Sequence, residues 1–297
     1  MKTIDRDIEN IIKEYQFSFK ESNANIITDS SQFSSFDKLF YEAFPNLSFE
    51  QKTKVNYISD LLYIAVMTTD RVIDNQEESY WQELVFFSKI LWEKAQLKLV
   101  QLFPVDHAFW EYYNKYNRQF IQACLLEQKL HFKKIQTYSR ESFNTIAAGK
   151  ATIAKVPIIA MCFLADQSSF IPKLELSIDH YFTGLQLKDD LIDWRIDLKE
   201  KRYSYLLTQV IRDKKWEDQL AEIHVDAIGR VIFYADYAVT TIKEALQLYQ
   251  QAIESLENID CTDWKKFIAN DTKNSKGLQQ HIEDTVAQEI EKIEVMS

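Results

Sequence analysis

The scarcity of glycine and proline constrains the fold of this chain more than any other feature of its sequence. The 297 residues contain only four of each, far fewer than average usage gives. Neither residue occurs between Pro45 and Pro104. Because most tight turns depend on glycine or proline, a sheet-rich fold is disfavoured. The span between the two prolines predicts two long helices with one short connection, and the whole chain, residues 1–297, is predicted to be all-α, a single-domain helical bundle.

Apolar periodicity predicts where the helices lie. Ser48 and Gln51 are typical of a helix start, as N-cap and N3 residues. Pro157 predicts a kink near Ile153, because it removes the hydrogen bond to that carbonyl. The run 80–103 is apolar on most sides and is expected to be largely buried. We expect helices over residues 4–15, about 48–73, 80–103, 109–138, 143–164 and 174–200, and one or two more over 216–256, where Gly229 could interrupt the helix. A polar stretch is expected at 22–35, a loop at 270–277 and a last helix ending near residue 294.

Charge and cysteine usage exclude several classes of protein. The net charge is −10 and no block of basic residues occurs, which disfavours nucleic acid and anionic membrane surfaces as partners. The three cysteines, Cys124, Cys162 and Cys261, are scattered without a CxxC, so neither a disulfide framework nor a zinc site is implied. No secretory signal and no apolar run of transmembrane length is apparent. We expect a cytoplasmic protein without an integral membrane segment.

The segment LQLKDDLIDWRID carries four aspartates. Asp189, Asp193 and Asp197 lie at i, i+4 and i+8 and form one stripe on a helix, with Asp190 beside it. Like charges at these spacings repel each other, and apolar residues around the stripe predict a segment that is buried nearly all round. Ionised carboxylates in such a place need a cation, and oxygen ligands without His or Cys favour Mg²⁺. Gln186, one turn earlier, is placed to orient the carboxylates; a helix of solvated aspartates is the alternative.

A second carboxylate pair lies upstream in VMTTDRVIDNQEE. Asp70 and Asp74 are at i and i+4, on a helix face that also carries Tyr63, Val66 and Met67. This pattern favours a carboxylate pair at the rim of a hydrophobic cavity. A solvated acidic helix end remains open as the alternative.

These segments resemble a known family. GLQLKDDLIDWRIDLKEKR resembles the second aspartate-rich motif of trans-isoprenyl diphosphate synthases, and its spacing is similar to the metal triad of class I terpene synthases. The Asp70/Asp74 pair resembles the first motif, with Arg71 replacing its second aspartate, and its DxxxD form also resembles head-to-head prenyl synthases. IAAGKATIAKVP resembles the segment whose lysine, here Lys150, contacts diphosphate. The resemblance covers about residues 50–250.

The resemblance implies an all-α bundle around a central apolar cavity, with a prenyl diphosphate as substrate and two acidic helices facing each other across the mouth. Three Mg²⁺ ions would be bound by Asp70, Asp74, Asp189, Asp193 and Asp197, the first four of these being catalytic. The diphosphate would be contacted by Lys150, Gln186, Asp190, Lys201, Arg202 and Tyr203. Tyr63 and Met67 would lie near the cavity floor, and a homodimer is possible. Candidates for the cavity wall are Phe86, Phe87, Tyr112, Tyr116, Phe120 and Phe182.

One departure from the family pattern bears on the reaction. Chain-elongating synthases bind a second diphosphate through basic elements, whereas this chain has SFKESNANIITD near its N-terminus and the acidic NQEESYWQE after Asp74. This favours a Mg²⁺-dependent class I terpene synthase that ionises one allylic prenyl diphosphate and cyclises or quenches the cation. Prenyl chain elongation or condensation by a prenyltransferase is the alternative.

Three further readings concern other classes of protein. Arg71 favours a non-catalytic regulatory subunit of a prenyl synthase, and paired acidic helices also occur in all-α nucleotide pyrophosphatases. A di-iron bundle is disfavoured because no Glu-x-x-His pair occurs. Glu127 and His131, at i and i+4, are expected on the surface.

Overall fold

Every regular element in the part of the chain that the structure describes is a helix. The computed structural model describes residues 2–18, 35–74, 80–131, 135–136 and 138–296. The prediction of an all-α fold is therefore confirmed. The contacts divide the helices into two units that interleave along the chain: unit 1 holds residues 1–117, 153–171 and 260–263, and unit 2 holds residues 118–152, 172–259 and 264–297. The single-domain organisation stays a prediction.

Unit 1 is built on two long helices. Helices α3 (Phe49–Asp74) and α4 (Trp81–Leu102) pack along each other, as the span without glycine or proline predicts. The unit also contains α1 (Lys2–Glu14), the 3₁₀ helices η3 (Phe36–Ala43) and η4 (Ser168–Phe170), the first part of α5 (Phe109–His131) and nearly all of α7 (Thr152–Leu164).

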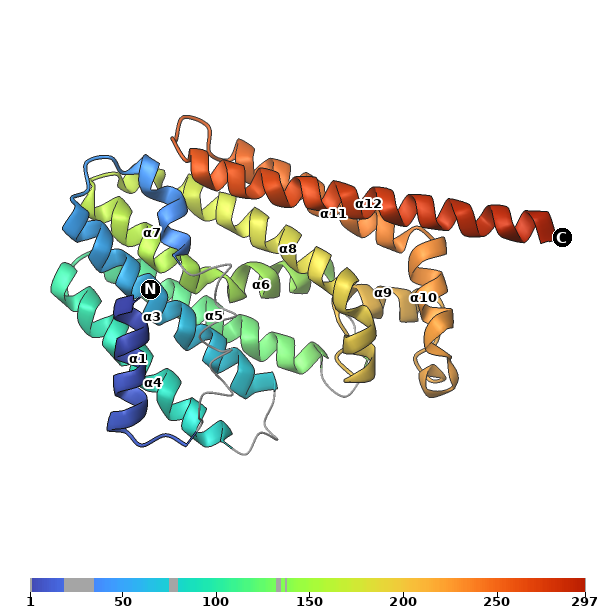
Figure 1. Ribbon diagram of the computed structural model, residues 1–297, viewed down its shortest axis with the longest axis horizontal. Coiled ribbons are helices and arrows are strands. Elements are labelled where there is room, and N and C mark those ends of the chain that lie inside the picture. Colours follow the sequence, from blue (N-terminus) through green and yellow to red (C-terminus); the bar gives the residue numbers. More distant parts are fainter. Residues whose placement is uncertain (1, 19–34, 75–79, 132–134, 137, 297) are drawn as a thin grey trace. The chain divides into compact units, whose positions relative to one another are not determined.

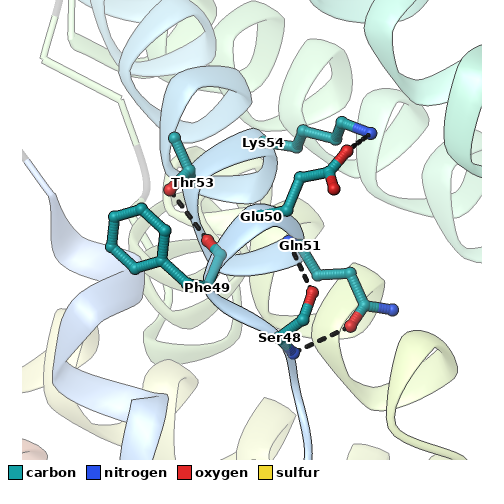
Figure 2. Close-up of polar contacts among 6 residues, drawn as sticks. All are labelled: Ser48, Phe49, Glu50, Gln51, Thr53 and Lys54. Carbon is teal, nitrogen blue, oxygen red and sulfur yellow. Dashed lines mark hydrogen bonds and ion pairs between the residues drawn. The ribbon is translucent and has the colours of Figure 1, made fainter.

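The start of α3 is fixed by its cap (Figure 2). The backbone N–H of Gln51 donates to Ser48 Oγ at 3.2 Å, and the backbone N–H of Ser48 donates to Gln51 Oε1 at 2.9 Å. These reciprocal bonds satisfy two donors that a helix start would otherwise leave without partners. The helix start predicted from the sequence is confirmed.

The expectation that α4 is largely buried is wrong. One face of the helix is core, with Leu84, Phe87, Leu91, Ala95 and Leu99 all buried. The opposite face is apolar yet open to solvent, because α3 covers only one side of α4. We call this face the α4 stripe; its members are Val85, Phe86, Leu97 and Val100, which are 41, 60, 64 and 44% exposed.

Unit 2 holds the remaining helices. These are the second part of α5, then α6 (Arg140–Lys150), α8 (Ile171–Lys199), α9 (Tyr205–Asp213), η5 (Leu220–Glu222), α10 (Val225–Tyr234), α11 (Tyr237–Glu254) and α12 (Thr262–Met296). Helices α9, α10 and α11 pack against one another. Their core includes Trp194 of α8, Leu207 of α9, Ile232 of α10 and Ile282 of α12. This core holds the aspartate helix α8 in place.

Two predictions for unit 2 differ from the structure. Residues 270–277, expected as a loop, lie inside α12. Buried Trp264, Ile268 and Ile282 anchor the helix on both sides of this polar run, and such packing overrides weak local propensity. Helix α5 ends at His131 rather than near Tyr138, and α9 is an element that the periodicity did not reveal.

The expected helix over residues 143–164 is two helices. Helix α6 ends at Lys150 and α7 begins at Thr152, so the break falls at Ala151, two residues before Ile153. Pro157 lies in the middle of α7. In the part of the chain that the structure describes, no single helix is long and apolar enough to cross a membrane. Helices α6 and α7 reach that length and apolar composition only when the two are counted together. The predicted polar stretch at 22–35 falls, except for Ser35, outside the described residues.

Candidate functional site

The first aspartate pair lies in the last turn of α3. Asp70 is half-buried, and Asp74 is the last residue of the helix, with its side chain outside the described part of the chain. Between them, Arg71 donates to the Tyr80 hydroxyl at 3.3 Å and its guanidinium lies 6.0 Å from the Tyr80 ring centroid. Arg71, the residue that departs from the family pattern, is thus tied to the N-cap residue of α4.

The other residues predicted for unit 1 lie on the same two helices. Tyr63 is half-buried, whereas Met67 is 41% and Phe86 60% exposed. A pocket of about 500 Å³ does occur in unit 1, but it lies at the opposite end of α3, lined by Tyr57 and Asp60 among others. None of the predicted site residues lines it. The hydrocarbon cavity therefore stays a prediction.

The second aspartate motif lies in the C-terminal half of α8. Asp193 is exposed, while Asp189 and Asp197 are half-buried. Ile192 and Ile196, on the same side of the helix, are 55% and 52% exposed. The expectation that this segment is buried nearly all round is wrong, since the core of unit 2 covers only the side with Leu187, Leu191 and Trp194.

The carboxyl of Asp189 lies in a partly buried environment that disfavours its charged form. Burial raises the pKa of Asp189 to about 6, Lys188 opposes the rise, and the charges of Asp193 and Asp271 add to it. Lys188 is itself 3.9 Å from Asp271. A cation bound between Asp189 and Asp193 would relieve this repulsion.

Asp190 points away from that pair into the core. It is 3% exposed and accepts a hydrogen bond from Gln186 Nε2 at 2.9 Å. Burial raises its pKa to about 7, while the bonds from Gln186 and the Leu206 backbone oppose the rise. Gln186 thus orients Asp190, as the sequence predicts, but Asp190 fits a structural role better than the predicted contact with diphosphate.

The end of α8 fixes Arg202 beside Asp197. Lys201 has a φ of 56°, and the N–H groups of Lys201 and Arg202 donate to the carbonyls of Leu198 and Asp197 at 3.2 and 2.8 Å. These are the two bonds of a Schellman motif. The Arg202 side chain lies 3.6 Å from the Asp197 carboxylate and also pairs with Glu200. Asp197 therefore already has a cationic partner, and Lys201 is exposed.

Lys150 ends α6 and contacts an acidic residue of α5. Its Nζ lies 2.8 Å from Glu127 Oε2, with the two side chains 26% and 12% exposed. Glu127 was expected on the surface, and this expectation is wrong. Gly149 explains the contact, because the absence of a side chain there lets α6 approach Ala123, one turn before Glu127.

His131 was also expected on the surface, and this expectation is wrong as well. It is 9% exposed, its Nε2 lies 3.1 Å from the Tyr138 hydroxyl, and its carbonyl accepts the Tyr203 N–H at 2.9 Å. Burial, with the charges of Lys150 and Arg202, lowers the pKa of His131 to about 4. The signal was present as the i, i+4, i+8 spacing of Ala123, Glu127 and His131, which places all three on one helix face.

The remaining predicted residues divide between core and partly open positions. Tyr203 is 9% exposed within the core of unit 2, so it fits a structural role better than the predicted contact with diphosphate. Phe182 is half-buried, with its ring 5.2 Å from that of Tyr181. Among the other wall candidates, Phe87, Tyr116 and Phe120 are buried and Tyr112 is half-buried.

The acidic residues of α8 fit a divalent cation in part. Among the described residues no cluster of three or more His, Cys, Asp or Glu side chains is arranged to hold a metal ion. Asp189 and Asp193 lie one turn apart on α8 and offer hard oxygen ligands suited to Mg²⁺, whereas Asp197 would first have to release Arg202. The predicted meeting of these residues with Asp70 and Asp74 stays a prediction, because the two pairs belong to different units.

Comparisons with known proteins place the fold. No protein-family profile matches the chain, and no curated protein sequence matches it. Among solved structures, the octaprenyl pyrophosphate synthase of Helicobacter pylori superposes with a TM-score of 0.71 at 12% identity, over 91% of this chain and 97% of that one. The resemblance read from the aspartate motifs is confirmed at the level of fold: this chain has the all-α fold of the isoprenyl diphosphate synthases.

Proposed function

We propose that the chain is a Mg²⁺-dependent prenyltransferase, which ionises an allylic prenyl diphosphate and joins the prenyl group to a second isoprenoid. The observation that carries the proposal is the placement of Asp189 and Asp193 one turn apart on the side of α8 that the core of unit 2 leaves uncovered, in a chain with the fold of a prenyl pyrophosphate synthase. The fold by itself is compatible with several reactions of prenyl diphosphates. The aspartate pair adds the place where a cation and a diphosphate would meet.

The residues of the chain have distinct roles in this proposal. Asp189 and Asp193, together with Asp70 and Asp74, would hold Mg²⁺, which when bound neutralises the charge that grows on the departing diphosphate. Lys150 and Arg202 would add positive charge beside it, and Lys201 is exposed next to Arg202. Gln186 and Asp190 would stiffen the helix turn below the metal ligands through their hydrogen bond.

The open isoleucines of α8 suit the hydrocarbon part of the substrate. Ile192 and Ile196 alternate with Asp189 and Asp193 on the exposed side of the helix. A prenyl diphosphate has one charged end and one apolar chain, so a surface that combines carboxylates for metal with apolar side chains complements both parts. A nucleotide would offer no comparable apolar chain for these isoleucines, which disfavours the nucleotide pyrophosphatase alternative.

A class I terpene synthase is the second candidate, and the sequence supplies its argument. The segment after Asp74 is acidic, so the basic residues that would bind a second diphosphate are not found there. An enzyme that uses one prenyl diphosphate and cyclises or quenches the cation would not need them. Both candidates share the ionisation step and the same metal ligands.

Product analysis separates the candidates. Purified protein is incubated with Mg²⁺ and prenyl diphosphates of ten, fifteen, twenty or twenty-five carbons, with and without isopentenyl diphosphate, and both pyrophosphate release and extractable products are measured. Longer prenyl diphosphates that form only with isopentenyl diphosphate would establish prenyl transfer by elongation. Hydrocarbons or alcohols that form without it and keep the carbon number of the substrate would establish a terpene synthase. A hydrocarbon with twice the carbon number of the substrate would instead establish condensation of two prenyl diphosphates, which is prenyl transfer. Absence of turnover with every substrate would contradict both and favour the non-catalytic subunit.

A further inference from the structure

One face of α5 in unit 2 carries a row of three residues against α6 and its neighbours. Ala123 meets Gly149, Glu127 pairs with Lys150 at 2.8 Å, and His131 contacts Tyr138 at 3.1 Å. Because these residues are spaced by four, the contact at Gly149 sets the separation of the helices for the pair one turn further on. The Glu127–Lys150 pair is thus fixed by helix packing and not by two mobile surface side chains.

Among the described residues, Lys150 and Arg202 are the two cations whose charges act on His131. His131 lies near both, and it is neutral at pH 7 because burial and these two cations lower its pKa to about 4. Each cation already has acidic partners: Glu127 for Lys150, and Asp197 with Glu200 for Arg202. These carboxylates therefore neutralise the positive charge that would otherwise attract an incoming diphosphate.

The position of Glu127 makes this balance hard to relieve. Its side chain is only 12% exposed, so the carboxylate cannot turn into water when Lys150 turns toward another anion. An anion that reached Lys150 would therefore compete with Glu127 for the ammonium and would also be repelled by it. Mg²⁺ that arrives with the anion supplies extra positive charge and so offsets the repulsion by the Glu127 carboxylate.

We propose that Glu127 is a resident counter-anion of Lys150 that closes the diphosphate subsite to anions arriving without metal. The inference rests on the proposed function, since it assigns Lys150 to the diphosphate. Glu127 itself touches neither substrate nor metal; it acts through Lys150 and makes diphosphate binding depend on the accompanying Mg²⁺. Removal of the negative charge of Glu127 then allows a diphosphate without metal to bind at Lys150.

Binding of inorganic pyrophosphate in the presence of EDTA tests this inference without any turnover. Isothermal titration calorimetry compares the unaltered protein with Glu127→Gln, which keeps the shape of the side chain and removes its charge. Glu244→Gln is the matched control, because it removes a carboxylate from another ion pair of unit 2, that with Arg140. The double variant Glu127→Gln/Lys150→Met reports whether any gain in affinity passes through Lys150, and circular dichroism verifies the helical fold of each variant.

The expected result is that Glu127→Gln binds metal-free pyrophosphate at least about tenfold more tightly than the unaltered protein, as the gain of one charge-assisted contact predicts. Glu244→Gln should show no gain in affinity. In the double variant Glu127→Gln/Lys150→Met, the gain seen with Glu127→Gln should be absent. If Glu127→Gln does not fold, Glu127→Asp, which draws the carboxylate back from Lys150, should give a smaller gain in the same direction.

Two results would overturn the inference in distinguishable ways. Equal metal-free affinity of Glu127→Gln and the unaltered protein, with pyrophosphate bound by both when Mg²⁺ is added, would show that Glu127 does not guard the subsite, and the proposed function would stand. Failure of every variant and of the unaltered protein to bind pyrophosphate even with Mg²⁺ would remove the subsite itself. The proposed function would then fail together with the inference.

Discussion

Gly149 of α6 faces Ala123 of α5 so closely that a Cβ added to the glycine would lie 2.5 Å from the Ala123 Cβ. The Gln119 carbonyl oxygen would be 3.2 Å away, so neither neighbour leaves room for a methyl group. The relationship connects packing to chemistry, because Lys150 follows Gly149 directly and Glu127 follows Ala123 by one turn.

Replacement of Gly149 by alanine should therefore destabilise the protein. We expect Gly149→Ala to lower the free energy of unfolding by about 2 kcal/mol, since overpacking of a filled site costs 1–3 kcal/mol. Chemical denaturation measures the change. Gly277→Ala is the control, because a Cβ there meets nothing within 4 Å and should stabilise α12 by about 0.5–1 kcal/mol. Equal effects of the two substitutions would contradict the packing argument.

The aspartates of α8 should separate into two functional classes. Asp189→Asn and Asp193→Asn should each lower Mg²⁺-dependent pyrophosphate release by about a hundredfold or more, because they remove charge from the proposed metal site. Asp190→Asn should retain most of the activity, since Asp190 is buried against Gln186. Release is measured with a coupled phosphate assay on variants whose helical content is unchanged. A loss with Asp190→Asn as large as with Asp189→Asn would place Asp190 among the metal ligands.

The stability of the protein should depend on pH through Asp60 in unit 1. Burial and the charge of Asp37 raise the pKa of Asp60 to about 6, opposed by the Ser35 N–H and Lys38. The folded state therefore holds a proton that the unfolded chain releases near pH 4, and the free energy of unfolding falls as pH rises through about 4 to 6. Asp60→Asn should raise the free energy of unfolding by about 2 kcal/mol at pH 7.5 and by less than half as much at pH 4.5.

Denaturation of Asp60→Asn at the two pH values checks this dependence. Asp106→Asn serves as the control, because Asp106 is an exposed carboxylate of the same unit. The account of Asp60 fails if its replacement leaves the difference in stability between pH 4.5 and pH 7.5 as large as in the unaltered protein.

The α4 stripe should mediate association between copies of the chain. Its members Phe86 and Leu97 are 60% and 64% exposed, and large apolar side chains that gather on one open helix face mark interaction surfaces. We expect the protein to sediment as a dimer and Phe86→Glu/Leu97→Glu to sediment as a monomer with unchanged helical content. Gln101→Glu, an exposed polar position of α4, should remain dimeric. A monomeric unaltered protein would contradict the expectation.

Much of the fold could be predicted from local sequence. The absence of glycine and proline between Pro45 and Pro104 predicted α3 and α4, and the Ser48/Gln51 cap was identified to the residue. These features depend on hydrogen bonds within four residues, so they are visible without tertiary contacts. The loop expected at residues 270–277 failed for the complementary reason, because Trp264, Ile268 and Ile282 hold that polar run in α12 through distant partners.

The candidate site divides in the same way. The sequence by itself determined the helical class of the fold and the spacing that places Asp189, Asp193 and Asp197 on one side of α8, because both follow from backbone periodicity. Only the tertiary structure decided that Asp190 faces the core, that Arg202 forms an ion pair with Asp197 and that Glu127 forms an ion pair with Lys150. These pairings join residues from different turns and helices, and their energies depend on burial and on the close approach at Gly149, which no local pattern encodes.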